Sequence, residues 1–366
     1  MNKQKSIQEN FKKITMKYTL CKFCSSRLTK KNKKQYDQCF ICKNIFEKID
    51  DIVLRISENL SSYEFSNFET GVIIKPSIID RDDHIKSQFE IRGISSVKSN
   101  INHELSKRLA QRTNRSINYL DPDISIKVNF KDNSYEIKPK SIYLYGRYIK
   151  KSRKIRQKQH NCTNCFGKGC YTCNFYGLVN FDSVGGQISK FLIKKFDCKQ
   201  VKINWIGGEE KTSLVLGNGR PFFAKIVNPK KRKKIIRSKT KLQGIELLEL
   251  RKIDTLPKDQ IFFKSKIDVI MKTDTPIKSR ELKNLEHSAM PLILHIDGKK
   301  SATKKIYKIN FKKLSTKSFK INFYADGGIP IKSLIQGSTV IPNITDLLKT
   351  KCECIQFDFK KIDVMS

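Results

Sequence analysis

Eight of the eleven cysteines fall into four Cys-x-x-Cys pairs, which makes metal binding the most direct chemistry that this sequence suggests. Two thiolates three residues apart can hold one ion from a tight turn, and two such turns complete the tetrahedral four-sulfur shell of structural zinc. In a reducing compartment this pattern favours metal over disulfides. The four pairs are Cys21/Cys24, Cys39/Cys42, Cys162/Cys165 and Cys170/Cys173.

The two sets of pairs differ in spacing. Fourteen residues separate Cys24 from Cys39, which is typical of a zinc ribbon, whereas only four separate Cys165 from Cys170. Glycines in the segment CTNCFGKGCYTC allow the tight fold-back that zinc would need, but a redox or iron–sulfur role stays open there. The remaining cysteines have no such partners, and we expect them to be buried as small apolar residues. They are Cys198, Cys352 and Cys354.

A second candidate site is the stretch GGEEKTSLVLGNGRPF, residues 207–222. It places Glu209 and Glu210 before a Gly-Asn-Gly turn and Arg220. A guanidinium near an acid can position the carboxylate or bind a phosphate. The alternative is structural, with Arg220 forming a salt bridge to Glu209 at the end of a strand.

The charge balance points to a polyanionic partner. The chain has 74 Lys+Arg against 35 Asp+Glu, a formal charge of +39, of which an AT-rich coding bias could account for a part. Two runs, YGRYIKKSRKIRQKQH and PKKRKKIIRSKTKL, contain no acid. Either run alone could be a solvated loop, but tyrosines beside the first favour RNA, because aromatic rings stack on unpaired bases. The predicted RNA-binding residues are Arg147, Tyr148, Lys150, Lys151, Arg153, Lys230, Lys231 and Arg232.

Length and hydropathy favour a protein of two or three domains without a membrane segment. The composition is 38% hydrophobic and includes 22 Phe, enough for sizeable cores. No apolar run approaches the roughly 18 residues that would span a bilayer, and the polar start MNKQKSIQENFKK does not resemble a signal peptide. We therefore expect a cytoplasmic protein.

Periodicity predicts the elements that position these residues. A helix is expected over 100–113, and alternating strands are expected over 123–130, 134–140 and 141–148, which gives a compact α+β unit from about 75 to 148. After the second cysteine cluster the pattern predicts a helix over 183–196, and strands over 199–208 and 220–229. Further strands in KIYKINF, SFKINFYA and CIQFDFKKIDV and a helix near NITDLLKT complete a second α+β domain of about 190 residues.

The order of several motifs resembles the archaeal tRNA pseudouridine synthases that modify positions 54 and 55 of the TΨC arm. The matching features after the first cysteine set are LDPD with YLYGRYIKKSR, GKGCYTCNFYG, LGNGRPF followed by NPKKR, and IKSLIQG before PNITDLL. The resemblance covers nearly the whole chain. It implies an α+β protein with a zinc ribbon over 1–50, a THUMP-like RNA-binding module over 51–158, a second Cys cluster and hinge over 159–176, and a mixed-sheet pseudouridine synthase-like domain over 177–366.

The resemblance also implies the chemistry. Such enzymes detach uracil from its ribose, turn it and rejoin it through carbon, using one carboxylate and no organic cofactor. The target base leaves its stack first. The partner would be tRNA, zinc would be structural, and no obligate protein partner is evident.

The family motif Gly-Arg-Glu-Asp precedes LGxGRPF, and aligned without gaps its catalytic Asp falls on Glu210, while its Arg falls on Gly208. Glu is one methylene longer than Asp. The family's stacking tyrosine has no clear counterpart, and Phe262 or Phe263 could replace it. The family's C-terminal Gly-Tyr-Ile-Lys pattern is GIPIKSLIQG here.

Three other functions stay open. The chain could be a tRNA-binding or tRNA-folding factor that keeps the scaffold without the chemistry. A THUMP-bearing methyltransferase or thiolation enzyme is disfavoured because no glycine-rich nucleotide fingerprint is evident. A chaperone is disfavoured because the sequence contains only one partial glycine–cysteine repeat.

Overall fold

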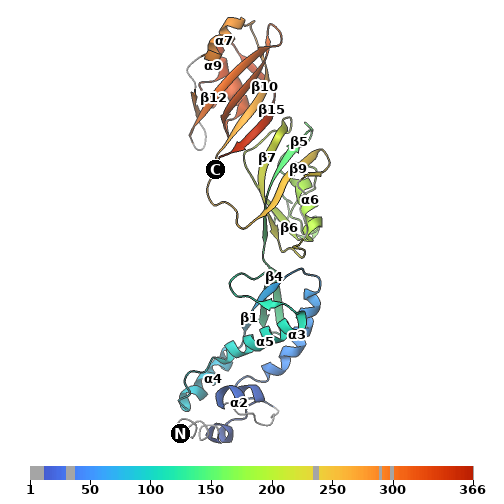
Figure 1. The fold of residues 1–366 in the computed structure, drawn as a ribbon, viewed down its shortest axis with the longest axis vertical. Helices are drawn as coiled ribbons and strands as arrows, with labels where there is room; N and C mark the ends of the chain where they lie inside the picture. Colours follow the sequence, from blue (N-terminus) through green and yellow to red (C-terminus); the bar gives the residue numbers. More distant parts are fainter. Residues whose placement is uncertain (1–11, 30–37, 234–238, 288–290, 297–300, 366) are drawn as a thin grey trace. The chain divides into compact units, whose positions relative to one another are not determined.

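The computed structural model describes residues 12–29, 38–233, 239–287, 291–296 and 301–365, arranged in two compact units (Figure 1). One unit comprises Met1–Lys140 with Asn228–Lys233, and the other comprises Ser141–Val227 with Lys234–Ser366. The predicted module over 51–158 therefore differs from the first unit, which ends before the strand at 142–150. Within the described residues, no helix combines the length and the apolar character needed to cross a bilayer.

The first unit packs helices against one face of a four-stranded sheet (Figure 1). Its strand order is β2-β1-β3-β4, in which β1 is parallel to both neighbours and β3 is antiparallel to β4. The predicted helix over 100–113 corresponds to α5, which begins after a Ser96 cap and ends at a left-handed Asn114. The elements are α2 (Lys22–Thr29), α3 (Ile45–Leu60), β1 (Asn67–Ile73), α4 (Pro76–Gln88), α5 (Val97–Thr113), β2 (Ser116–Ile117), β3 (Ile124–Asn129) and β4 (Ser134–Pro139).

The first cysteine set belongs to this core and does not form a separate layer. Its four side chains are buried together with Ile41, Phe46 and Leu105. The described residues around it are helical, since α2 contains Cys24 and α3 begins soon after Cys42, whereas a zinc ribbon is built from strands. The part of the basic segment RLTKKNKK from residue 30 onward lies outside the described residues.

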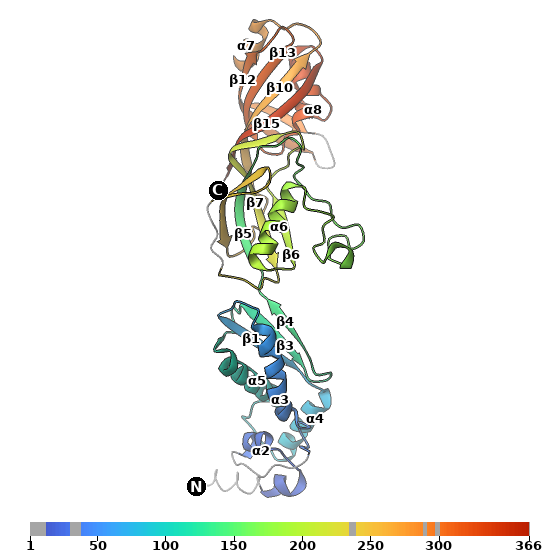
Figure 2. The ribbon, with the colours of Figure 1, turned by 90° about the vertical axis from the view of Figure 1, so that its right-hand side faces the viewer.

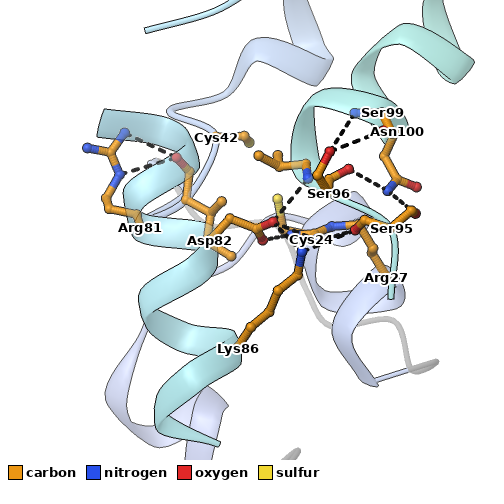
Figure 3. Close-up of polar contacts among 12 residues, drawn as sticks. Cys24, Arg27, Cys42, Arg81, Asp82, Lys86, Ser95, Ser96, Ser99 and Asn100 are labelled. Atoms are coloured by element: carbon orange, nitrogen blue, oxygen red, sulfur yellow. Dashed lines mark hydrogen bonds and ion pairs between the residues drawn. The ribbon is translucent and has the colours of Figure 1, made fainter. Parts of the chain in front are cut away.

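The buried carboxylate of Asp82 links the helices around the first cysteine set (Figure 3). Asp82 on α4 accepts hydrogen bonds from Arg27 on α2, from Lys86 at 2.8 Å and from the backbone N–H of Val97 at 3.0 Å. Arg81 donates at 3.1 Å to the carbonyl of Ile41, which lies within the Cys39/Cys42 pair. An unpaired buried charge is costly, so the fold favours the arrangement in which the Asp82 carboxylate keeps all its partners. These contacts therefore hold α2, α4 and α5 together.

The second unit is built on one mixed sheet with the order β14-β11-β12-β13-β10-β15-β7-β5-β9-β8, and β6 pairs with β7. Helix α6 lies beside β6 in both views (Figures 1 and 2). The elements are β5 (Ile142–Lys150), η1 (Tyr171–Cys173), α6 (Val184–Phe196), β6 (Gln200–Trp205), β7 (Leu214–Val227), β8 (Lys239–Lys241), β9 (Ile245–Ile253), β10 (Phe263–Thr273), α7 (Ser279–His287), β11 (Leu292–Ile296), β12 (Ala302–Lys313), β13 (Ser318–Asp326), α8 (Ile331–Gln336), β14 (Val340–Ile341), α9 (Ile344–Leu348) and β15 (Cys352–Val364).

The two halves of this sheet meet where β15 runs parallel to the start of β7, over only two residue pairs. Side chains reinforce this short junction. Arg153 binds the carboxylate of Asp358 through two contacts of 2.6 and 2.8 Å, and the same carboxylate accepts from the backbone N–H of Leu214 at 2.9 Å. The junction matters for function because the acidic pair at 209–210 directly precedes β7.

The Gly-Asn-Gly segment of the LGNGRPF motif, which the sequence predicts to be a turn, lies within β7 and brings the strands of this junction close together. Gly217 has a φ of 57° and Gly219 a φ of 72°. A Cβ on Gly217 would clash with the carbonyl of Lys360, and one on Gly219 would lie 2.7 Å from the carbonyl oxygen of Tyr148. Between them, the amide of Asn218 donates to and accepts from the backbone of Ile362, both at 2.9 Å. The motif therefore serves first as the contact between β5, β7 and β15.

Candidate functional site

A buried ion cluster lies beneath the acidic pair. The Glu209 carboxylate lies 3.1 Å from Arg220 Nε and 3.3 Å from Lys150 Nζ, and all three side chains are fully buried. Arg220 also donates to the carbonyl of Ile206 at 3.1 Å, and its guanidinium stacks over Phe359 with 4.2 Å to the ring centroid. The structural alternative for Arg220, a salt bridge to Glu209, is what the structure contains.

Lys150 fixes the course of the loop that carries both acids. Its amine donates to the carbonyl of Glu210 at 2.9 Å, and it contacts the carbonyls of Lys211 and Ile155 at 3.3 and 3.0 Å. Burial lowers the pKa of Lys150, and the neighbouring Glu209 carboxylate opposes that shift. The backbone at Glu210 is thus tied to the end of β5.

The Glu210 side chain points away from this buried cluster and is 41% exposed. Its Oε2 lies 2.9 Å from Nζ of Lys332 on α8, and this hydrogen bond raises the pKa of Lys332. The sequence motif IKSLIQG contains Lys332, but its role was not foreseen, because the pairing depends on a contact between segments far apart in the chain.

The two segments that carry this pair also contribute to the lining of a cavity of about 210 Å³. Its lining includes Gly208 and Pro330, which stand two residues before Glu210 and Lys332, respectively. Two further lining residues, Arg220 and Ser265, place buried polar atoms there: within the described residues, Arg220 Nη2 and Ser265 Oγ have no hydrogen-bond partner. Buried polar groups are normally satisfied, so these two atoms suit a polar ligand.

Aromatic rings form part of the cavity wall. Phe263 and Phe359 both line it. The Phe263 ring packs against Gly207 and Gly327 so closely that a Cβ on either glycine would collide with it. Phe262, the other candidate for a stacking ring, is 58% exposed and does not line this cavity. The cavity therefore combines an aromatic wall with polar residues, which are Arg220, Ser265 and Asp326.

Three of the eight predicted RNA-binding residues, Arg147, Tyr148 and Lys150, are buried. Arg147 donates to the carbonyls of Asn218 at 2.6 Å and Gly219 at 2.9 Å, and also to that of Ile362. Tyr148 accepts a hydrogen bond from Gln157, and burial raises its pKa. Arg147 and Lys150 donate to carbonyls inside the protein, and all three side chains are shielded from solvent and hence from a direct RNA contact.

The other predicted RNA-binding residues are less buried but mostly paired. Lys151 lies 3.5 Å from Glu246, and Arg153 binds Asp358. In the first unit, Lys230 lies over the Tyr63 ring, and Arg232 pairs with Asp123 at 3.2 Å. Lys231 is half-buried. Residues 234–238 of the second basic run lie outside the described part of the chain.

Both cysteine sets have the geometry of a four-sulfur metal centre. In each set the four Sγ atoms lie within 4.8 Å of one another. The Cys21–Cys42 pair is 3.6 Å apart, and in the second set the Cys162–Cys170, Cys165–Cys173 and Cys170–Cys173 pairs are 3.9, 3.8 and 3.8 Å apart. Zn–S bonds of about 2.3 Å give tetrahedral S···S distances of about 3.8 Å. The residues of both sets fit zinc.

Comparison with known proteins places these features in one family. Residues 143–363 match the model described as Pus10, C-terminal, and residues 52–129 match the archaeal Pus10 THUMP domain. The protein of Nitrosopumilus maritimus (strain SCM1) named tRNA pseudouridine synthase Pus10 is 39% identical over 96% of both chains. Its namesake from Cenarchaeum symbiosum (strain A) is 31% identical over 91% of this chain and 83% of its own.

Likeness to solved structures is weaker. The crystal structure of a Cbf5-Nop10-Gar1 complex matches with a TM-score of 0.30 at 10% identity, covering 48% of this chain and 44% of that one. So low a similarity supports no conclusion about this chain.

Proposed function

Because the chain belongs to the Pus10 family, we propose that it is a tRNA pseudouridine synthase, an isomerase that acts on uridine 54, uridine 55 or both in the TΨC arm. The observation that carries this proposal is the Glu210–Lys332 pair. Gly208 and Pro330, from the same two segments, line a cavity with an aromatic wall. A single carboxylate is enough for the reaction, so no organic cofactor is required.

The reaction conserves every atom of the nucleotide. The bond from ribose C1′ to uracil N1 breaks, a bond from C1′ to C5 forms, and a proton moves from C5 to N1. We assign Glu210 as the carboxylate that acts as nucleophile or base, with Lys332 holding it in place. Lys150 acts indirectly, because it ties down the loop backbone. Arg220 pairs with Glu209 through Nε, which leaves Nη2 for the base.

The uracil would occupy the adjacent cavity after leaving its stack. The ring of Phe263 offers an apolar face to the base. Arg220 Nη2 can donate to a uracil carbonyl, and Ser265 Oγ can donate or accept. Both atoms lack a partner within the described residues, so a base there would satisfy them.

The cysteine sets and two basic side chains complete the proposal. Each set holds one structural zinc ion, and Lys151 and Lys231 contribute to phosphate contacts with the tRNA. A tRNA substrate is consistent with a cytoplasmic protein.

The test is detection of pseudouridine in unmodified tRNA after incubation with the purified chain, by carbodiimide treatment and sequencing. We expect product at position 54, 55 or both, and none with Glu210→Gln, which retains shape but lacks the charge. tRNA affinity should change little in this variant. Equal activity of Glu210→Gln and the native protein would remove Glu210 from the mechanism. A wild-type chain that binds tRNA tightly without forming product would instead favour a tRNA-binding or tRNA-folding factor.

A further inference from the structure

The second cysteine set forms a small knuckle between β5 and α6, which projects beside α6 in Figure 2. A bridge between Asn161 and Leu178 closes its base. Tight turns at Gly169 and Gly177 bring backbone N–H groups to the sulfurs, with N···S distances of 3.1 Å to Cys165 and 3.2 Å to Cys173. Zinc in this cage would hold the turns rigidly.

The knuckle exposes three aromatic rings. Phe166 is 80% exposed, Tyr171 is 87% exposed and Phe175 is 50% exposed. The rings of Tyr171 and Phe175 lie together, with centroids 5.1 Å apart. Rings in a segment this short, held by metal ligands, contribute little to a folded core. A cluster of exposed apolar rings commonly marks a binding surface.

The backbone indicates that these rings are retained despite a conformational cost. Phe166 and Phe175 adopt left-handed conformations, with φ values of 50° and 62°. Gly or Asn tolerates this region better than a bulky residue, and Asn174 next to Phe175 occupies it with φ of 48°. Since neither ring is buried, packing does not account for phenylalanine at these positions. Backbone strain of this kind is often found at functional sites.

Charge and shape around the knuckle favour an anionic ligand. No Asp or Glu occurs between Lys158 and Phe181, and Lys168 lies within the knuckle itself. Phe166 also borders a cavity of about 480 Å³, whose lining includes Lys158, Lys202 and Trp205. Lysines beside exposed rings are the combination that binds single-stranded nucleic acid, because the cations hold phosphates while bases stack on the rings.

We propose that this knuckle is a second RNA-binding surface, where unpaired bases stack on Phe166, Tyr171 and Phe175 and the backbone is held by Lys158, Lys168 and Lys202. Its residues differ from those assigned to the isomerase site and from residues 52–129, which match the THUMP model. The proposal takes from the proposed function only the expectation that the polyanion is RNA.

The test measures affinity of the zinc-loaded full chain for a 12-nucleotide uridine-rich RNA strand and for the same strand annealed to its complement. We expect Tyr171→Leu, which keeps apolar bulk but lacks a π face, to weaken single-strand binding about fivefold or more, and Tyr171→Trp to retain it. Leu120→Ala, at a residue 99% exposed in the first unit, is the control and should bind like wild type. Duplex binding should change little in every variant.

A second variant separates function from structure. Phe166→Asn suits the left-handed backbone, so we expect a thermal midpoint equal to or above that of wild type, full zinc content and weaker single-strand binding. A fall in zinc content or thermal midpoint would mean that the ring has a structural role and would contradict the proposal. Unchanged RNA affinity in both Tyr171→Leu and Phe166→Asn would overturn it and leave a protein partner as the occupant of the rings. Pseudouridine formation is scored separately, so an inactive wild-type chain would affect the proposed function and not this result.

Discussion

Nζ of Lys332 lies 2.9 Å from the carboxylate of Glu210, although the two residues come from α8 and from the loop before β7. Neither side chain is buried, so the pair contributes little to stability. Its consequence is orientation, because the cation restrains the carboxylate. The segments of both residues contribute to the cavity lining, through Gly208 and Pro330. Hydrogen bonds from the Lys150 side chain to backbone carbonyls hold the loop, and Lys332 holds the Glu210 side chain.

Removal of Lys332 should therefore reduce catalysis more than binding. We expect Lys332→Met to lower the single-turnover rate of pseudouridine formation about a hundredfold or more, because small displacements of a catalytic group are costly. Lys332→Arg should retain part of the rate. Lys320→Met, which breaks a lysine–carboxylate pair with Asp268 elsewhere in the unit, is the matched control. A rate for Lys332→Met within threefold of this control would contradict the assigned role.

The adjacent Lys150 and Lys151 should behave in opposite ways. Lys150→Met removes one of two cations from buried Glu209 and should cost about 3 kcal/mol of stability, with loss of activity and an unchanged salt dependence of tRNA binding. Lys151→Met should leave stability nearly unchanged and reduce the slope of log affinity against log salt by up to about one unit. The measurements are chemical unfolding and tRNA titrations at several salt concentrations. If Lys150→Met instead kept its stability and reduced the salt slope, Lys150 would again be a candidate RNA contact.

The same two lysines illustrate what the sequence could predict. Periodicity located α5, β3 and α6, because each has a regular pattern of buried residues. Periodicity could not show which cations of β5 are buried and which face solvent. Register shifts at residues 145/147 and 148/150 interrupt the alternation of this strand. The buried Arg147 and Lys150 donate to carbonyls of the Gly-Asn-Gly segment and of the acidic loop. Only the folded chain brings these carbonyls near β5.

The cysteine spacing predicted two metal centres, and the sulfur geometry of both fits zinc. The spacing did not predict which elements surround them. A ribbon was expected for the first set, whereas Cys21 directly precedes α2, and Arg27 on that helix binds Asp82 on α4. That contact depends on tertiary packing and has no signature in the local sequence. Lys332 was missed for the same reason.

Loss of the first zinc ligand set should destabilise the whole first unit. Cys21→Ser should reduce zinc from two ions per chain to one and lower the thermal midpoint, since structural zinc contributes folding free energy and this set shares one core with α3 and α5. Elemental analysis and thermal unfolding measure both effects. Cys198→Ser is the control: this thiol is buried outside both sets, and burial raises its pKa to about 12. Two ions in Cys21→Ser would exclude this centre.

The junction between β7 and β15 should weaken in acid. Burial alone would raise the pKa of Asp358, but hydrogen bonds from Arg153 and from the backbone of Leu214 lower it overall. A lowered carboxylate pKa stabilises the fold above the ordinary Asp value of about 4, and this stabilisation is lost as pH falls through the folded pKa. Asp358→Asn should thus cost about 1 to 2 kcal/mol at pH 7, a moderate figure because Arg153 is partly exposed. At pH 3 the difference should shrink.

The control for this pH effect lies on the same strand. Asp363 pairs with Lys361 at 3.0 Å near the surface, so Asp363→Asn should cost about 0.5 kcal/mol or less at either pH. Urea unfolding of the three proteins at pH 3 and pH 7 gives the comparison. A cost of Asp358→Asn that does not depend on pH would mean that ionisation of this carboxylate does not stabilise the junction.

Shortening the proposed catalytic side chain tests whether the site is built for glutamate. Glu210→Asp withdraws the carboxylate by about one methylene, breaks its contact with Lys332 and should lower the rate about a hundredfold with tRNA affinity unchanged. If the rate instead rises about tenfold or more, roughly 1.4 kcal/mol of the wild-type barrier comes from a misplaced carboxylate. The Glu210–Lys332 pair would then be an unproductive arrangement. If neither the wild-type chain nor Glu210→Asp forms product while both bind tRNA tightly, the scaffold serves RNA binding without isomerisation.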